Sequence, residues 1–473
     1  MSSEFADLQI INPADGTVLA TVPITTAEQV AEHTADAQRV FDSGVWSGLA
    51  PRERAAVLLR LAVLMERDAE LLARLDSEDA GKPITECLEG DIPGAIESIR
   101  YFAECADKLY GAVAPAPGNV LAFTQREPFG VVAAILPWNY PLAMAAWKIG
   151  PALASGNCLV LKPADATPRS ALHVASLAEE AGIPGGVLRV LPGTGQVTGA
   201  ALASDPIVGA LSFTGSTRTG RAILVAAAES NLKRVSLEMG GKSPQIVFAD
   251  GLEFGDTLIE GLITAAFMTQ GQNCTAGSRI LVHESIHDQV VERLAAAAKE
   301  LVVGLPSDPT TQVGPIINAS AADRIMAAVT HAVDGGAVSV AGGNEVRVAD
   351  GGRYIAPTVL TSIPADDPIL TTELFGPVTI VQKFSTRDEA IAIANAIDYG
   401  LAASVYTKNI DDALATARGV QAGVVSVGNY SEGDLTSPFG GWKQSGFGGA
   451  EKGLRAFEQW TREKAIWIEL QGH

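Results

Sequence analysis

The sequence is poor in cysteine and in positive charge, and both shortages limit what the protein can be. Only four cysteines occur among 473 residues (Cys87, Cys105, Cys158 and Cys274), and they show neither close pairing nor metal-site spacing. We therefore predict no metal site. The formal net charge of -20 argues against nucleic acid and against anionic membranes as partners.

Long apolar runs, repeats and low-complexity segments are also missing. The runs Val131–Leu136 and Leu159–Leu161 are too short to cross a bilayer. No signal peptide is recognised at the start, so we expect a protein of the reducing cytoplasm. A chain of 473 residues is too long for one core, and two or three domains are expected.

What the sequence does contain is an alternation of short apolar runs with helical patterns. Four runs are typical of buried strands followed by helices: Val131–Leu136, Cys158–Leu161, Val187–Leu191 and Val208–Phe213. The rhythm returns after Cys274, from Ile280–His283 to Val424–Val427. This alternation predicts an α/β fold whose two halves meet near residue 240, each with a parallel sheet covered by helices.

The beginning and end of the chain follow a different pattern. Helical spacing of apolar residues predicts helices over Thr26–Asp42, Pro51–Ser77 and Ile92–Leu109. The segment Ala112–Glu127 has an extended pattern, and Ala465–Leu470 is strand-like. Exposed ribbons of this kind often contact another subunit.

Cys274 lies in a run of small and polar residues, Gln270–Arg279, between a helical segment and a strand-like one. A thiol in such a turn can attack a carbonyl, and a neighbouring backbone N–H can hold the resulting oxyanion. A buried structural cysteine beside a turn is the alternative and the commoner fate of a lone cysteine.

Polar residues follow the predicted strands, where an open parallel sheet binds its ligands. Asn139 offers an amide donor for an oxyanion, and Lys162 with Asp165 suits a ribose diol. Ser216 begins a predicted helix, where free N–H groups bind anions. The alternatives are a turn asparagine, an exposed turn and a simple helix cap.

Two carboxylates precede glycine turns. Glu238, ahead of Gly240, can act as a mobile general base, or it is a solvated turn residue. Glu373 and Phe375 could bind a second ribose and pack on its base, or they belong to a loop with a core phenylalanine. The run Gly193–Gly199 lacks the usual dinucleotide spacing.

In their order along the chain these motifs resemble those of the aldehyde dehydrogenase superfamily, in its NAD(P)-dependent, thioester-hydrolysing branch. The similarity extends from the first strand to the tail. It rests on Pro137–Asn139, Lys162–Asp165, Phe213–Thr217, Leu237–Ser243, Gly271–Cys274, Glu373–Pro377 and Ser437–Gly446. Other segments look closest to γ-glutamyl-γ-aminobutyraldehyde and related aminoaldehyde dehydrogenases: Gly81–Ile84, Asp91–Gly94, Ser216–Gly220, Ser230–Val235, Glu432–Asp434 and Lys464–Ile468.

The resemblance implies a Rossmann-like NAD-binding domain (residues 1–109 and 129–239) and an α/β catalytic domain (residues 240–436). It also implies a small β oligomerisation domain, formed by the ribbon 110–128 and the tail 437–473. A homodimer or homotetramer is expected, in which tail strands extend a neighbour's sheet.

For the chemistry, the resemblance implies that the Cys274 thiolate adds to the aldehyde carbon and that Asn139 and the Cys274 N–H hold the oxyanion. Hydride then leaves for the nicotinamide, and Glu238 activates the water that hydrolyses the thioester. Lys148 matches a family lysine that tunes this network, although a solvated helix residue is the alternative. The substrate is a small-molecule aldehyde.

The family's cofactor contacts carry over to one set of residues: Ile135, Pro137, Trp138, Lys162, Asp165, Gly195, Phe213, Gly215, Ser216, Glu238, Gly240, Glu373 and Phe375. NAD is the expected cofactor. NADP stays open as the alternative, because many NAD-preferring relatives have glutamate where Asp165 stands, and a shorter carboxylate repels a 2′-phosphate less closely.

A substrate tunnel is expected between apolar walls, lined by Tyr140, Met144, Trp147, Thr275, Tyr430 and Phe439. Met144 and Trp147 lie at helical spacing and could instead be ordinary core residues. The subgroup match suggests that Asp91, Glu432 and Asp434 meet a substrate amine near the mouth. Solvated loop acids are the alternative for Glu432 and Asp434.

One segment departs from the family, and two other functions stay open. Relatives have Gly-Arg-acid where this chain has Gly446–Glu451; if one glycine is an insertion, Ala450 replaces the arginine and Glu451 keeps the acid.

A CoA-acylating dehydrogenase is one rival function, although such relatives lack the Glu238 carboxylate. A non-catalytic binding or structural protein on the same fold is the other.

Overall fold

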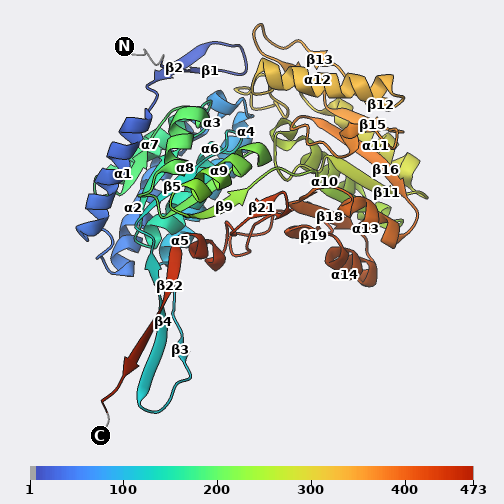
Figure 1. Cartoon of the computed structure of the whole chain (residues 1–473). Helices are drawn as coiled ribbons and strands as arrows, with labels where there is room; N and C mark the ends of the chain where they lie inside the picture. The colour runs from blue at the N-terminus through green and yellow to red at the C-terminus, as the bar shows by residue number, and fades with distance from the viewer. Residues whose placement is uncertain (1–6, 472–473) are drawn as a thin grey trace.

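The protein, described by a computed structural model over residues 7–471, has two helix-covered bodies and a ribbon that projects from the first (Figure 1). Each body is built around one mostly parallel sheet. The α/β class predicted from the alternation of apolar runs and helical patterns is therefore confirmed.

The first sheet has six strands in the order β21-β9-β8-β5-β6-β7. Its strands are β5 (Val131–Ile135), β6 (Cys158–Lys162), β7 (Leu188–Val190), β8 (Ala210–Thr214), β9 (Arg234–Glu238) and β21 (Gly446–Phe447). All neighbours pair in parallel except β21, which runs antiparallel to β9. Every residue of β5, β6 and β8 is buried, because helices cover both faces of the sheet.

Several helices of the first body begin at a small polar cap or have proline in their first turn. The helices of this body are α1 (Ala27–Asp42), α2 (Pro51–Arg67), α3 (Ala69–Ala80), α4 (Ile84–Glu86), the π-helix η1 (Cys87–Asp91), α5 (Ile92–Cys105), α6 (Pro141–Ala154), α7 (Arg169–Glu180), the π-helix η2 (Gly195–Gly199), α8 (Ala200–Ser204) and α9 (Thr217–Glu229). Thr26 caps α1 in a reciprocal capping box with Gln29. Ser216 caps α9 by accepting a hydrogen bond from the Thr219 N–H.

Two predicted helices are wrong in detail. The helix expected over Pro51–Ser77 is broken at Asp68, whose φ of -101° and ψ of 17° are not helical. The Asp68 carboxylate binds Arg67 and the His173 ring, which favours this local turn. The apolar spacing continues across the break because α2 and α3 pack on one core. The helix expected after the strand run Val187–Leu191 is split into η2 and α8.

The second sheet has seven strands in the order β12-β15-β16-β11-β10-β18-β19. They are β10 (Pro244–Val247), β11 (Arg279–His283), β12 (Val338–Ala341), β15 (Thr358–Thr361), β16 (Val378–Phe384), β18 (Ala402–Tyr406) and β19 (Val424–Val427). Around it lie η3 (Gly251–Phe254), α10 (Asp256–Phe267), η4 (Met268–Gly271), α11 (His287–Glu300), α12 (Ala319–Asp334), η5 (Pro368–Leu370), α13 (Arg387–Asn395) and α14 (Ile410–Gly419). The edge strand β12 is antiparallel to β15, so the sheet is not purely parallel.

Smaller strand pairs and the ribbon complete the fold. The pairs are β1 (Leu8–Ile11) with β2 (Val18–Val22), β13 (Glu345–Val346) with β14 (Tyr354–Ile355), and β17 (Tyr399–Gly400) with β20 (Trp442–Lys443). The ribbon is a three-stranded antiparallel sheet of β3 (Val113–Ala114), β4 (Val120–Pro128) and β22 (Thr461–Glu469). The extended segments predicted at both places are thus paired with each other.

The chain crosses between the bodies twice. It leaves the first sheet after β9 and returns when β21 pairs with β9. After the return, η6 (Leu454–Gln459) packs Ala456, Phe457 and Trp460 into the core of the first body. The second body is therefore inserted into the first, and both crossings run beside the end of β9.

Within residues 7–471 no helix is long and apolar enough to cross a membrane. Over the same range, no three His, Cys, Asp or Glu side chains are arranged as ligands of a metal ion.

Candidate active site

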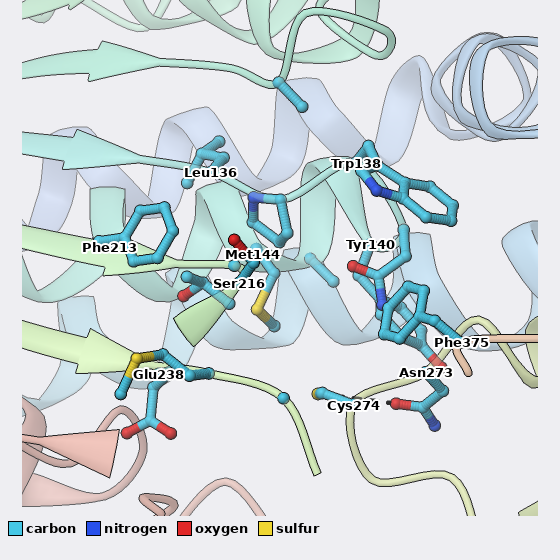
Figure 2. Close-up of a pocket in the computed structure, with 18 of the residues that line it drawn as sticks. Leu136, Trp138, Tyr140, Met144, Phe213, Ser216, Glu238, Asn273, Cys274 and Phe375 are labelled. Atoms are coloured by element: carbon cyan, nitrogen blue, oxygen red, sulfur yellow. Dashed lines mark hydrogen bonds between the residues drawn. The ribbon is translucent and has the colours of Figure 1, made fainter. Parts of the chain in front are cut away.

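A cavity of about 1150 Å³ lies between the two bodies, at the carboxyl ends of the first sheet's strands. Most of the predicted residues line it: Ile135, Pro137, Trp138, Asn139, Tyr140, Met144, Trp147, Lys162, Asp165, Gly195, Phe213, Gly215, Ser216, Glu238, Gly240, Cys274, Glu373, Phe375 and Phe439. Figure 2 shows Cys274, on a loop of the second body, facing the strand ends that carry Phe213 and Glu238. The structure thus gathers residues that the sequence predicted separately.

Cys274 lies in the cysteine loop, residues 268–278, which joins α10 to β11. The loop begins with three left-handed residues, at which φ is 53° for Thr269, 55° for Gln270 and 64° for Gly271. This conformation costs a non-glycine residue ~1–2 kcal/mol. A Cβ at Gly271 would lie 2.2 Å from the Gly376 carbonyl oxygen, so only glycine fits there.

The Cys274 thiol is partly exposed to the cavity, and its Sγ lies 3.7 Å from the Asn273 Oδ1 (dashed line in Figure 2). Burial raises the pKa of the Cys274 thiol well above its usual value, and the carboxylates of Glu432, Glu373 and Glu238 raise it further. Forming the thiolate therefore requires a base or a neutralising charge nearby.

Asn139 is held against the cysteine loop. Its loop, residues 136–140, joins β5 to α6, and the Asn139 Nδ2 donates to the Gln272 carbonyl oxygen at 2.8 Å. One N–H of the buried amide is thereby fixed, and the other is left to donate to a bound oxygen atom. This geometry suits an oxyanion donor.

Glu238 ends β9 and is buried beside the cavity. Among the described residues its Oε2 has no hydrogen-bond partner. Burial raises the pKa of the Glu238 carboxyl well above its usual value, and the negative charge of Glu451 raises it further, whereas Lys148 lowers it. A carboxyl group with a raised pKa is a stronger base than an ordinary carboxylate, which suits a general base.

Lys148 is fully buried on α6, so it is not the solvated helix residue of the alternative reading. Its Nζ forms an ion pair with Glu451 and donates to the Ser212 Oγ at 2.9 Å. Glu451 lines the cavity, so it links this buried pair to solvent. The preceding residue, Ala450, takes no part in this ion pair, and its backbone carbonyl accepts from the Gln459 Nε2.

Lys162 and Asp165 form an ion pair at the end of β6. The Lys162 Nζ lies 2.7 Å from the Asp165 Oδ1, and the Gly195 N–H donates to the Asp165 Oδ2 at 3.3 Å. Burial lowers the pKa of the Lys162 ammonium. A buried ammonium beside a half-exposed carboxylate offers a donor and an acceptor to a diol.

Glu373 reaches the cavity from the second body. Its Oε1 accepts from the Gly241 N–H at 2.9 Å, and a Cβ at Gly240 would lie 2.0 Å from its Oε2. Burial raises the pKa of the Glu373 carboxyl to about 7. Phe375, at a φ of 58°, meets the Trp138 ring edge-on at 5.4 Å between centroids.

These features fit a bound dinucleotide. The cavity exceeds the roughly 300–1,000 Å³ that a drug-sized ligand needs, and Ser216, the N-cap of α9, lines it. We call the strand ends and turns that present Lys162, Asp165, Ser216 and Gly240 the cradle. The cradle offers diol and anion contacts at the edge of the first sheet.

Tyr140, Met144, Trp147 and Phe439 line the predicted substrate side of the cavity, and the Trp147 and Phe439 rings lie 5.6 Å apart.

Thr275 and Tyr430 are not among the described residues that line the cavity. They lie behind Cys274, where the Thr275 Oγ1 and the Tyr430 hydroxyl are 2.8 Å apart. Their predicted place in the tunnel wall is thus corrected to a hydrogen-bonded layer that supports the cysteine loop.

The three acids predicted at the mouth differ. Glu432 lines the cavity and binds the Thr275 hydroxyl, so it lies close behind the thiol. Asp91 also lines the cavity, but the buried Lys82 already pairs with it at 2.5 Å. Asp434 is not among the described lining residues.

Two residues that the sequence did not single out also contribute. The Lys452 Nζ donates to the Glu432 and Gly433 carbonyl oxygens, at 2.7 and 2.9 Å, and so fixes the turn that carries Glu432. Asn273 donates to the Tyr430 hydroxyl at 3.1 Å. The sequence around Lys452 does not indicate this role, because the carbonyl groups that it binds lie about twenty residues away in sequence.

Comparison with known sequences gives one consistent picture. The profile of the Aldehyde dehydrogenase family matches residues 1–466. An aminoacetaldehyde dehydrogenase of Pseudomonas aeruginosa is 45% identical over 459 residues, covering 97% of this chain and 91% of that protein. The NADP/NAD-dependent aldehyde dehydrogenase PuuC of Escherichia coli is 42% identical over 472 residues, covering 99% and 94%.

Solved structures of aldehyde dehydrogenases are also similar to this chain. A mutant of the indole-3-acetaldehyde dehydrogenase AldA of P. syringae, in complex with NAD+ and IAA, superposes with a TM-score of 0.96 at 44% identity, covering 99% of this chain and 94% of that one. The γ-glutamyl-γ-aminobutyraldehyde dehydrogenase of Burkholderia cenocepacia superposes with a TM-score of 0.95 at 46% identity, covering 98% and 94%.

Proposed function

The chain belongs to the aldehyde dehydrogenase family and oxidises aldehydes to carboxylic acids with NAD(P)+, and we propose that Cys274, Asn139 and Glu238 carry out this reaction. The observation that carries the proposal is that all three side chains line one cavity. A thiol, an amide donor and a carboxyl with a raised pKa are the groups that thioester chemistry needs.

In the first step Cys274 gives its proton to Glu238, directly or through water, and the sulfur attacks the aldehyde carbon. A C–S bond forms, and the carbonyl π electrons move to oxygen. The free N–H of Asn139 and the Cys274 backbone N–H bind this oxyanion. A bound nicotinamide would supply the hydride acceptor for this carbon. When the oxyanion re-forms its carbonyl, Cys274 carries a thioester.

In the second step Glu238 takes a proton from water, and the water oxygen attacks the thioester carbon. The C–S bond breaks, the acid leaves and the Cys274 thiolate returns. The raised pKa of Glu238 makes it a stronger base than an exposed carboxylate. The buried pair of Lys148 and Glu451 carries the proton from Glu238 toward solvent, because Glu451 lines the cavity.

In the cradle, Lys162 and Asp165 would hold the adenine ribose and Ser216 the pyrophosphate, and Glu373 would hold the nicotinamide ribose. NAD is the preferred cofactor in this proposal, because the Asp165 carboxylate repels a 2′-phosphate. The domain roles follow: residues 1–109 and 129–239 bind the dinucleotide, and residues 240–436 present the thiol.

The substrates are aminoaldehydes in this proposal. The P. aeruginosa, E. coli and B. cenocepacia relatives include enzymes named for aminoacetaldehyde and for γ-glutamyl-γ-aminobutyraldehyde. Glu432 supports the assignment, because this carboxylate reaches the cavity and, among the described residues, forms no ion pair. A substrate ammonium would neutralise it beside the thiol. Asp91 contributes less, since Lys82 already pairs with it.

The ribbon joins subunits into a homodimer or homotetramer. It is supported by apolar side chains that are exposed on the free ribbon, with Val113 at 76% and Trp467 at 64% exposure. A cytoplasmic location is supported by four unpaired cysteines.

A panel of aldehydes tests the whole proposal. Reduced-cofactor absorbance is followed with NAD and NADP, with and without CoA, using aminoacetaldehyde, 4-aminobutyraldehyde and the uncharged butyraldehyde. We expect turnover without CoA, a higher kcat/KM for the amino compounds and a preference for NAD. Strict dependence on CoA would contradict the role of Glu238, and equal kcat/KM for 4-aminobutyraldehyde and butyraldehyde would contradict the role of Glu432.

A further inference from the structure

The left-handed turn at the start of the cysteine loop contains two residues for which this backbone conformation is unfavourable. Thr269 (φ 53°, ψ 38°) and Gln270 (φ 55°, ψ 28°) are not glycine, yet both keep a left-handed backbone. Such residues persist only where surrounding structure holds them. The turn therefore needs contacts from outside the loop.

Those contacts come from Glu86, the last residue of α4 in the other body. The Thr269 N–H lies 3.0 Å from the Glu86 Oε1 and 3.2 Å from its Oε2, and the Thr269 Oγ1 donates to Oε2 at 2.9 Å. Hydrogen bonds to a charged acceptor are stronger than neutral ones. Glu86 thus caps the first strained residue of the turn.

The neighbours of Glu86 hold the same turn. The Gln270 Nε2 donates to the Gly81 carbonyl oxygen at 2.5 Å, and the Tyr140 hydroxyl lies 3.1 Å from the Thr269 Oγ1. The Lys82 ammonium lies 3.7 Å from the centre of the Tyr140 ring. Three residues of the first body, Glu86, Gly81 and Tyr140, therefore contact two residues of the second.

The chain directly after Glu86 is irregular. Residues Cys87–Asp91 form the π-helix η1 between α4 and α5. A π-turn inserts an extra residue into a helix and is frequent at functional sites. Here it allows Glu86 to reach the cysteine loop while Asp91 reaches the cavity.

We propose that Glu86 is a positioning residue for Cys274: its carboxylate holds the strained turn, and the turn places both the thiol and the Gln272 carbonyl that orients Asn139. Glu86 is not among the described residues that line the cavity, so it acts through Thr269. The proposal rests on the role of Cys274 given above. Glu86 itself exchanges no proton with the substrate.

The first experiment compares Glu86→Gln with Glu89→Gln, an exposed glutamate on the same segment. We expect Glu86→Gln to lower kcat about tenfold, because a neutral amide accepts weaker hydrogen bonds from Thr269. Alkylation of Cys274 by iodoacetamide should slow to a similar extent, while the Kd for NAD+ stays unchanged. Glu89→Gln should match the parent enzyme in all three measurements.

The second experiment removes the strain. Glycine adopts the left-handed conformation freely, so in a Thr269→Gly background Glu86→Gln should lower kcat by less than about threefold. An equal loss in both backgrounds would mean a general structural role and would overturn the proposal. So would parental kcat and alkylation rate in Glu86→Gln.

A third variant covers the case in which Glu86→Gln does not fold. Thr269→Val keeps the side-chain shape and removes only the hydroxyl donor, and we expect kcat to fall about threefold. Unchanged kcat in a folded Thr269→Val protein would overturn the proposal. Failure of the proposed function would look different, because Cys274→Ser would then retain turnover whatever Glu86 does.

Discussion

The cysteine loop and the cradle line one cavity, but their geometry has different origins. In the cradle, Lys162, Asp165 and Ser216 lie in ordinary strand-to-helix turns of the first sheet, and Lys162 pairs with Asp165 three residues away. The cysteine loop is held by contacts from distant parts of the chain, such as Glu86 to Thr269 and Asn139 to Gln272.

The difference teaches that binding and chemistry are separable here. Cofactor affinity should depend on local turns of the first sheet, whereas turnover should depend on how the two bodies meet. Glu238 lies at the junction, since it ends a strand of the first sheet and its charge raises the pKa of Cys274 in the second body. Substitutions in the cradle should therefore weaken cofactor binding, whereas substitutions in the cysteine loop should lower turnover.

The largest effect is expected in the cysteine loop. Cys274→Ser should lower kcat about 10³-fold or more, because a serine hydroxyl is a far weaker nucleophile at neutral pH than a thiolate. The Kd for NAD+, measured by fluorescence titration, should stay at the parental value. Retained turnover, or loss of NAD+ binding, would contradict the proposal that the cysteine loop serves the chemistry and the cradle serves binding.

At the junction, Glu238→Gln should lower steady-state kcat about 10²–10⁴-fold, because the amide cannot take the proton of the attacking water. Stopped-flow absorbance should still show formation of up to one reduced cofactor per active site, since the thioester forms before water is needed. Loss of this burst together with turnover would indicate that Glu238 acts mainly in deprotonating Cys274.

The pH dependence follows from the same residue. Because burial raises the pKa of Glu238, its base form is lost as pH falls through that raised value. We expect kcat in the parent enzyme to rise with pH and to level off only above the ordinary carboxyl range. A kcat that is already constant from about pH 5 upward would contradict a raised pKa at the hydrolytic base.

In the cradle, Gly240→Ala should weaken NAD+ binding about tenfold, because the new Cβ would lie 2.0 Å from the Glu373 carboxylate and displace it. A matched control is Gly185→Ala, where a Cβ would meet no atom within 4 Å. The single-turnover rate at saturating NAD+ should change far less than Kd. A large drop in the single-turnover rate with a normal Kd would mean that Gly240 contributes to catalysis and not to cofactor binding.

The smallest effect is expected at Asp165. Asp165→Ser removes the carboxylate that faces the ribose, so the ratio of kcat/KM for NAD+ to that for NADP+ should fall about threefold to tenfold. Steady-state kinetics with both cofactors measure the ratio. An unchanged ratio would mean that the ribose 2′ position lies away from Asp165.

Much of the cradle could be predicted from the sequence because its signals are local. Buried strands such as Val131–Leu136 are continuous apolar runs, and a small polar residue such as Ser216 marks a helix start. The strand β9, by contrast, was not predicted, because its polar residues Ser236 and Glu238 interrupt the apolar pattern. Its burial comes from β21, more than two hundred residues later.

The support of the cysteine loop could not be predicted, because its partners are far apart in sequence. Glu86 and Thr269 are separated by 183 residues, and Lys148 and Glu451 by 303. A helical lysine such as Lys148 gives no hint of burial until its ion pair is seen. Thr275 and Tyr430 were expected in the tunnel wall, since neighbours of a nucleophile usually face its substrate, but they bind each other behind it.

The return of the chain to the first sheet has a consequence for biosynthesis. The acid Glu451 and strand β21, which border Glu238, belong to the last thirty residues of the chain. During translation the strands β5 to β9 are made first and can pair before β21 exists. The acid Glu451 and the core side chains Ala456, Phe457 and Trp460 join the first body only after the inserted second body has been synthesised.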